Sequence, residues 1–258
     1  MSVPTVILHH NADALAKTVA ARIITRLVDA QSAKGGASLV LTGGSVGIAT
    51  LAAIAATPAR DAVDWRRLDI WWGDERFLPA GDPERNETGA RAALLDLVDL
   101  DPARVHVMRG PDSGMTAEES AQAYAAELRA AARPEDHGPV PAFDVLLLGM
   151  GPDSHVASLF PGMPALYDER PVVAVHGAPK PPPTRISLSM PTIRAAREVW
   201  VVAAGEEKAG AVRLALSADS GAVQVPAAGA RGRQSTLFLL DRAAASKLPP
   251  GLGRTASA

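Results

Sequence analysis

The sequence predicts an α/β fold in which helices cover both faces of a mostly parallel β-sheet. Short apolar segments alternate along the chain with segments whose apolar residues recur at helical spacing. Several apolar segments, such as FDVLLLGM at 143–150, are nearly continuous, which is typical of strands buried on both faces. The proline-rich stretch 178–183 is too short to link two domains. We therefore expect a single domain over residues 1–258.

Strands are expected at residues 5–9, 37–42, 68–73, 143–150, 171–177, 185–190 and 198–205, with a last strand and helix in 236–248. Helices are expected after residue 11, at 45–57, 86–98 and 116–132, and within 205–216. Asn11 can cap the first helix, where Leu15 and Val19 begin the apolar stripe. Thr116 and Glu119 have the spacing of a capping box.

Composition excludes several classes of protein. The formal net charge is -2 and no Lys/Arg run occurs, so we expect neither nucleic acid nor an acidic membrane surface as a partner. The chain has no cysteine, which excludes disulfides, thiolate catalysis and Cys-based zinc sites. No segment approaches the roughly 20 apolar residues of a spanning helix, and the first residues lack the pattern of a secretory signal. These features predict a cytoplasmic location.

Four predicted strands end in polar or glycine-rich turns. In open α/β sheets, ligands bind beyond the carboxyl ends of the strands, so these turns are the first candidates for a site. The four turns cover residues 43–45, 73–76, 151–155 and 205–208.

Two of these turns, and the start of one strand, contain groups that suit an anion. Gly43, Gly44 and Ser45 lead into a helix, where backbone N–H groups and the helix dipole attract negative charge. Ser45 could serve as a helix cap or a phosphate donor, and a plain tight turn explains the stretch equally well. Lys208 near a helix start and Arg185 at a strand start could pair with a phosphate, although a lone lysine there is often only solvated.

His155 is the one histidine in a turn at a strand end. A single turn histidine is more often structural than catalytic, but Asp153, two residues earlier, could orient its ring and raise its basicity. Arg76 follows two acidic residues, so its simplest interpretation is an ion pair with Asp74 or Glu75. No HxH or HExxH spacing occurs, and we expect no metal site.

Taken together, these segments resemble the 6-phosphogluconolactonase family, within the superfamily that also contains the glucosamine-6-phosphate deaminases. The matching blocks are LTGGSVG (41–47), WWGDERFLP (71–79) with Asn86 shortly after, LLLGMGPDSHVASLFPG (146–162), RISLSMPTIRAAREVWVVAAGEEKA (185–209) and TLFLLDRAAA (236–245). They follow the family's order almost from end to end. The resemblance implies a three-layer α/β sandwich with a central, mostly parallel sheet.

The resemblance also implies roles for individual residues. His155 would be the general base that activates water for attack on a sugar-phosphate lactone, and Asp153 would orient it. The residues that would hold the substrate and its 6-phosphate are Gly43, Gly44, Ser45, Asp74, Arg76, Arg185 and Lys208. Lactone hydrolysis requires no cofactor and no metal, and the expected assembly is a monomer or a small homo-oligomer.

One position departs from the family pattern. The family usually has glycine where this chain has Ser154, and serine is strained if that backbone requires a positive φ.

Two rival functions are weaker. An amino-sugar phosphate deaminase or isomerase would use a glutamate shortly after the histidine, and residues 156–166 contain no carboxylate. A non-catalytic sugar-phosphate sensor would need a DNA-binding segment, and we expect none before residue 5.

Overall fold

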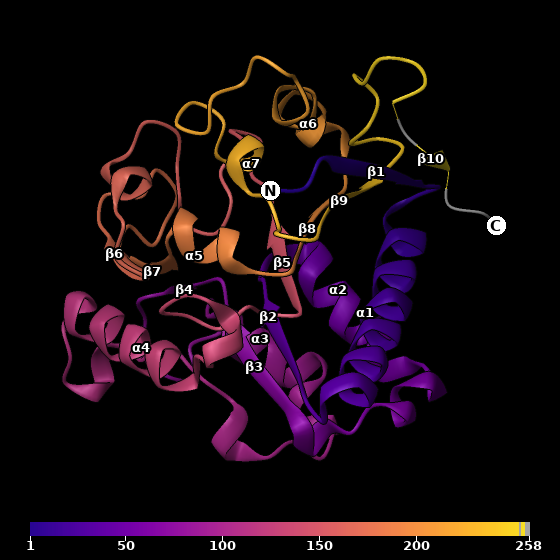
Figure 1. Ribbon diagram of the computed structural model, residues 1–258. Helices are drawn as coiled ribbons and strands as arrows, with labels where there is room; N and C mark the ends of the chain where they lie inside the picture. The colour runs from indigo at the N-terminus through magenta and orange to yellow at the C-terminus, as the bar shows by residue number, and fades with distance from the viewer. Residues whose placement is uncertain (253, 256–258) are drawn as a thin grey trace.

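A computed structural model describes residues 1–252 and 254–255 of the chain (Figure 1). Its main sheet has seven strands in the order β10-β1-β9-β8-β5-β2-β3, and every neighbouring pair is parallel. The strands are β1 (Pro4–His9), β2 (Ala37–Leu41), β3 (Leu68–Trp72), β5 (Val145–Gly149), β8 (Glu198–Ala203), β9 (Ser235–Asp241) and β10 (Arg254–Thr255). The predicted α/β class with a mostly parallel central sheet is confirmed.

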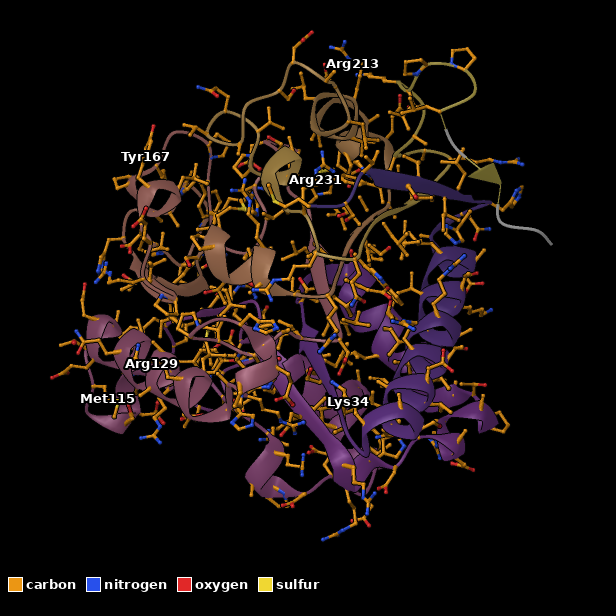
Figure 2. The ribbon with its side chains drawn as sticks, in the orientation of Figure 1. Lys34, Met115, Arg129, Tyr167, Arg213 and Arg231 are labelled. Carbon is orange, nitrogen blue, oxygen red and sulfur yellow. The ribbon has the colours of Figure 1, made fainter. Side chains whose placement is uncertain are left out.

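Helices cover both faces of this sheet. The helices are α1 (Ala12–Lys34), α2 (Gly44–Ala56), α3 (Asn86–Ala93), α4 (Ala117–Ala131), α5 (Met190–Ala195), α6 (Ala209–Ala215) and α7 (Pro226–Gly229). Figure 1 shows α1 and α2 side by side, away from α4 on the other side. Exposed charged side chains such as Arg129 of α4 and Arg213 of α6 point outward from the molecule (Figure 2).

Strand β5 shows why its sequence is continuously apolar. Val145 and Leu147 pack in the cluster that contains α1 and α2, whereas Leu146 and Leu148 pack in the cluster that contains α4 and α6. Successive side chains of a strand point to opposite faces, so a strand between two helical layers needs apolar residues at every position.

A second, smaller sheet was not predicted. Strands β4 (Asp74–Arg76), β7 (Arg185–Leu188) and β6 (Val172–Val175) form an antiparallel sheet in the order β4-β7-β6. The strands expected at 171–177 and 185–190 therefore exist but do not join the parallel sheet. In the register of β4 with β7, Arg76 lies opposite Arg185, so this small sheet joins two segments that the sequence analysis treated separately.

Two predicted helix caps are confirmed, whereas two predicted helices end early or do not form. The capping box of Thr116 and Glu119 is present, and Asn11 caps α1 by accepting a 2.9 Å hydrogen bond from the N–H of Ala14. Helix α3 ends at Ala93, before a short 3₁₀ turn. Residues 242–247 form turns instead of the expected final helix.

Candidate active site

The predicted turns meet around one cavity at the carboxyl ends of the central strands. Its volume is about 280 Å³. The lining residues are Thr42, Gly43, Gly44, Asp74, Arg76, Asn86, Gly149, Met150, Gly151, His155, Ala157, Lys180, Pro181, Arg185 and Lys208. The structure thus brings together seven of the nine predicted site residues as lining. Asp153 supports the site from behind His155, and Ser45 lies elsewhere.

His155 is fixed by a tight turn and by Asp153. The N–H of Gly151 donates to the carbonyl of His155 over 3.0 Å, and Asp153 Oδ1 lies 2.5 Å from His155 Nδ1. Gly151 is required here, because a Cβ on it would lie 2.1 Å from His155 Nδ1 and 2.3 Å from Asp153 Oδ1. The ring also packs against Phe160, with centroids 4.4 Å apart. The imidazole is therefore held in one orientation.

The electrostatics of this pair favour a neutral imidazole. Burial lowers the pKa of His155 below its usual value, and the hydrogen bond to Asp153 offsets this only in part. Burial alone would raise the pKa of Asp153, but its bond to His155 holds that pKa below its usual value. With Nδ1 donating to the carboxylate, Nε2 is the nitrogen with a free lone pair. The arrangement is that of an oriented general base.

Ser154 adopts the conformation that the family's glycine would favour. Its φ is 67°, in the left-handed region. Its hydroxyl donates to the carbonyl of Asp153 over 2.5 Å, so its proton is engaged within the turn.

Asp74 and Asn86 form a buried polar network on one wall. Asp74 Oδ2 accepts from the Ser158 hydroxyl over 2.7 Å, and Asn86 Nδ2 lies 2.8 Å from the backbone oxygen of Asp74. Asn86 also packs against Gly43, where a Cβ would lie only 1.9 Å from Asn86 Oδ1. The family-like pattern of the sequence includes Asn86 but assigned it no role in the site, because its contact with Gly43 joins segments far apart along the chain.

The cations of the site come from three segments. Lys208 and Lys180 both line the cavity, and Lys180, from the proline-rich loop, was not predicted. Burial lowers the pKa of Lys208, and the charge of Lys180 lowers it further. Two ammonium groups close enough to repel each other are stabilised when an anion lies between them.

Arg185 lines the cavity and also binds the backbone of the proline-rich loop. Its Nε donates to the carbonyl of Pro182 over 3.2 Å, and its Nη2 donates to the carbonyls of Lys180 and Pro181 over 3.0 and 3.1 Å. Its guanidinium also lies 5.7 Å from the ring centroid of Phe160. Arg185 therefore holds the loop that carries Lys180.

Arg76 and Ser45 do not make the contacts that the sequence suggested for them. Among the described residues, Arg76 makes no ion pair with Asp74 or Glu75, and its Nη1 donates to the backbone carbonyl of Glu84. Gly43, and not Ser45, is the N-cap of α2. The exposed Ser45 lines a shallow hollow between α1 and α2, outside the cavity.

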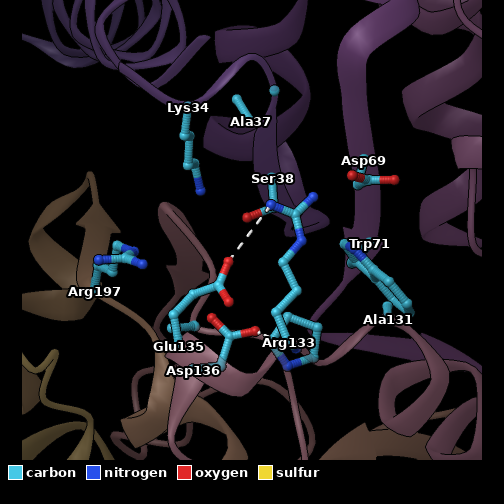
Figure 3. A pocket seen from close by; sticks show the side chains of 13 residues that line it. Lys34, Ala37, Ser38, Asp69, Trp71, Ala131, Arg133, Glu135, Asp136 and Arg197 are labelled. Carbon is cyan, nitrogen blue, oxygen red and sulfur yellow. Dashed lines mark hydrogen bonds and ion pairs between the residues drawn. The ribbon is translucent and has the colours of Figure 1, made fainter.

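A second cavity, of about 240 Å³, lies near the amino ends of β2 and β3 (Figure 3). Most of its charged side chains form ion pairs, and Asp136 accepts from the backbone N–H of Arg133 over 2.8 Å. The pairs are Lys34 with Asp144 at 2.8 Å, Arg104 with Asp69 at 2.9 Å, and Arg133 with Glu135 at 4.0 Å. This cavity is lined by an ion-pair network and lacks an oriented base.

Neither a metal cluster nor a membrane span is found in the part of the chain that the structure describes. No group of three or more His, Cys, Asp or Glu side chains is placed to hold an ion there. None of the helices described is long and apolar enough to cross a bilayer.

Residues 10–239 match the family of glucosamine-6-phosphate isomerases/6-phosphogluconolactonase. The chain belongs to this family. It is 61% identical over 258 residues to the 6-phosphogluconolactonase of Streptomyces coelicolor, covering 99% of this chain and 98% of that protein. It is 46% identical over 242 residues to the 6-phosphogluconolactonase of Mycobacterium tuberculosis, covering 93% and 96%. The family resemblance predicted from the sequence is confirmed.

Solved structures show the same fold. The 6-phosphogluconolactonase of Trypanosoma brucei superposes with a TM-score of 0.82 at 31% identity, covering 95% of this chain and 99% of that one. A monomeric glucosamine-6-phosphate deaminase superposes with a TM-score of 0.76 at 21% identity, covering 94% and 99%. The second match shows that lactonase and deaminase relatives share this fold. The fold alone therefore does not distinguish the two activities, and the residues of the site are needed for that.

Proposed function

We propose that this protein hydrolyses 6-phospho-D-glucono-1,5-lactone to 6-phospho-D-gluconate, in the oxidative pentose phosphate pathway. The observation that carries the proposal is the 2.5 Å contact between His155 Nδ1 and Asp153 Oδ1 beside a cationic cavity. The names of relatives at 61% and 46% identity support the same activity.

The His155–Asp153 pair acts as the general base of this reaction. Nε2 of His155 takes a proton from water while the water oxygen adds to the lactone carbonyl, and a tetrahedral intermediate forms. Asp153 stabilises the imidazolium that results. The bond from the carbonyl carbon to the ring oxygen then breaks, and the imidazolium returns its proton to that oxygen. The products are a hydroxyl group and a carboxylic acid, which ionises in water.

The cationic end of the cavity receives the 6-phosphate. Lys208 and Lys180 supply charge there, and the N–H groups of Gly43 and Gly44 lie at the start of α2. Ser45 contributes only its backbone N–H, since its side chain lies outside the cavity. Arg185 adds positive charge through a guanidinium that also holds the neighbouring loop. Asp74 and Arg76 contact the sugar.

Sequence and geometry both favour lactone hydrolysis over amino-sugar deamination. Residues 156–166 contain no carboxylate that could assist ring opening. The polar side chain of that segment nearest Asp74 is Ser158, which donates a hydrogen bond to it. We place the enzyme in the cytoplasm as a monomer or small homo-oligomer that acts without a cofactor, a metal or a nucleic-acid partner.

The deciding experiment compares two substrates. Freshly prepared 6-phosphogluconolactone is assayed by oxidation of its 6-phosphogluconate product, and glucosamine 6-phosphate is assayed by ammonia release. We expect turnover of the lactone only, and loss of that turnover in His155→Asn. Ammonia release without lactone hydrolysis would overturn the proposal.

A further inference from the structure

Glu75 lies between two residues of the cavity wall but does not line the cavity itself. It is the central residue of β4, between Asp74 and Arg76, and only 2% of it is exposed. Side chains alternate along a strand, so its carboxyl group points away from the side of the strand that carries Asp74 and Arg76. Glu75 takes no part in the proposed hydrolysis.

The carboxyl group of Glu75 caps α3 from a distant part of the chain. Oε1 accepts from the N–H of Asn86 over 2.7 Å, and Oε2 accepts from the N–H of Glu87 over 2.8 Å. These are the first two N–H groups of α3, and Arg85, at the N-cap position, makes no side-chain cap. Free N–H groups at a helix start need such acceptors. Glu75 Oε1 also accepts from the N–H of Arg76 over 2.8 Å.

What Glu75 holds in place is Asn86, the first residue of α3. The Asn86 side chain reaches into the cavity wall, donates to the backbone oxygen of Asp74 over 2.8 Å, and packs on Gly43. The contact with Gly43 leaves no room for a Cβ. A shift of the first turn of α3 would therefore shift the support beneath the Gly43–Gly44 turn.

We propose that Glu75 is a positioning residue for the phosphate end of the lactone site, acting through the first turn of α3 and Asn86 on the Gly43–Gly44 turn. This inference rests on the proposed function, because it assigns that turn to the 6-phosphate. It predicts that Glu75 controls substrate affinity through the phosphate and leaves the chemistry at His155 unchanged.

Glu75→Gln keeps the size of the side chain but replaces one acceptor oxygen with an NH₂ group that faces a backbone N–H. A displaced Gly43–Gly44 turn should weaken phosphate binding by about as much as the loss of one hydrogen bond, an affinity change of about two- to tenfold. At about pH 7.5, we expect KM for 6-phosphogluconolactone to rise by that factor while kcat stays within about twofold. KM for unphosphorylated glucono-1,5-lactone should stay unchanged, as monitored by pH-stat titration.

Glu87 offers a matched control at the same helix start. Its side chain pairs with Arg85 at 3.0 Å and Arg91 at 2.9 Å, and neither arginine lines the cavity. Glu87→Gln should change neither KM. Asn86→Ala should reproduce the rise in KM of Glu75→Gln, and the double variant should be no worse than either single variant by more than about twofold, because both act on one contact.

Several outcomes overturn the inference. They are equal rises in KM for both lactones, an equal effect of Glu87→Gln, full additivity of the Glu75 and Asn86 variants, or unchanged kinetics in Glu75→Gln. If Glu75→Gln does not fold, Glu75→Asp tests the same KM and kcat separation, because it withdraws the carboxyl group by one methylene. Failure of the proposed function itself would be visible separately, as absence of lactone hydrolysis by the unaltered enzyme.

Discussion

His155 Nδ1 and Asp153 Oδ1 lie 2.5 Å apart, in a turn where Gly151 leaves room for both side chains. A proton on Nδ1 would be held by this contact and would leave the lone pair on Nε2, the atom that we propose as the base. The first prediction concerns this pair. His155→Asn should lower kcat by about 10²–10⁴-fold, the usual contribution of a general base, with little change in KM. Steady-state kinetics of the purified variant measure both constants, and near-native turnover would show that the base lies elsewhere.

The pH dependence of the unaltered enzyme follows from the same geometry. The active form of the free enzyme has neutral His155, so kcat/KM should rise with pH through the pKa of His155 and then level off. Burial lowers that pKa below the usual 6.5, so the midpoint should lie below pH 6.5. Initial rates at lactone concentrations well below KM, between about pH 5 and 7.5 and corrected for spontaneous hydrolysis, measure it. A midpoint above pH 7 would contradict this assignment.

Lys208→Ala should remove a charge-assisted contact to the 6-phosphate, worth about 1.5–3 kcal/mol, and raise KM for the phosphorylated lactone accordingly. The unphosphorylated lactone serves as the control substrate, since its turnover should not depend on Lys208. Arg185→Ala should raise the same KM, because it removes a positive charge and also releases the loop that carries Lys180. Equal losses on both substrates would show that these side chains support only the fold.

Ser154→Gly should retain activity within about tenfold, because Ser154 contributes no catalytic group. Its φ of 67° places it in the left-handed region, where glycine relieves about 1–2 kcal/mol of strain. Glycine also adds entropy to the unfolded chain, so the net gain in unfolding free energy should be small. A collapse of kcat by several orders of magnitude, with unchanged circular dichroism, would make Ser154 a nucleophile and contradict attack by water.

Glu75 should make the folded protein less stable as pH rises. Burial raises its pKa to about 7 from 4.5, although three backbone N–H groups and Arg85 act in the opposite direction. Because the folded state binds this proton more tightly than the unfolded state, the contribution of Glu75 is most favourable below pH 4.5. That contribution is lost as pH rises toward and through 7, by up to about 3 kcal/mol. Urea unfolding of the unaltered protein and of Glu75→Gln at several pH values measures it.

The difference in unfolding free energy between these two proteins isolates this one carboxyl group, because other titrating groups are common to both. It should shift in favour of Glu75→Gln as pH increases from 5 to 8. A constant difference over that range would show that Glu75 titrates at its ordinary pKa.

The sequence predicted most of the parallel sheet and the contact between Asp153 and His155. Strands such as β5 were recognisable because burial on both faces demands apolar residues at every position. Asp153 and His155 were recognisable because they lie close together in sequence at a strand end. In both cases, a pattern within a few consecutive residues was sufficient for the prediction.

What escaped prediction depends on contacts between distant segments. The pairing of β4 with β7, the placing of Lys180 by Arg185, and the packing of Asn86 on Gly43 have no local sequence signal. Ser45 illustrates the opposite error, in which proximity along the chain wrongly predicted a side chain in the cavity. It directly follows two glycines of the cavity wall, but α2 begins at Gly44 and directs Ser45 to the outer surface.

The small sheet of β4, β7 and β6 also affects how quickly the enzyme becomes competent during folding. The cavity needs this antiparallel sheet to dock on the ends of the parallel one, and its groups are drawn from segments as far apart as Gly43 and Lys208. Closing such long loops is slow compared with forming helices. Recovery of catalytic turnover after dilution from denaturant should consequently lag behind recovery of the far-ultraviolet circular dichroism signal, so activity reports complete tertiary assembly rather than the presence of secondary structure.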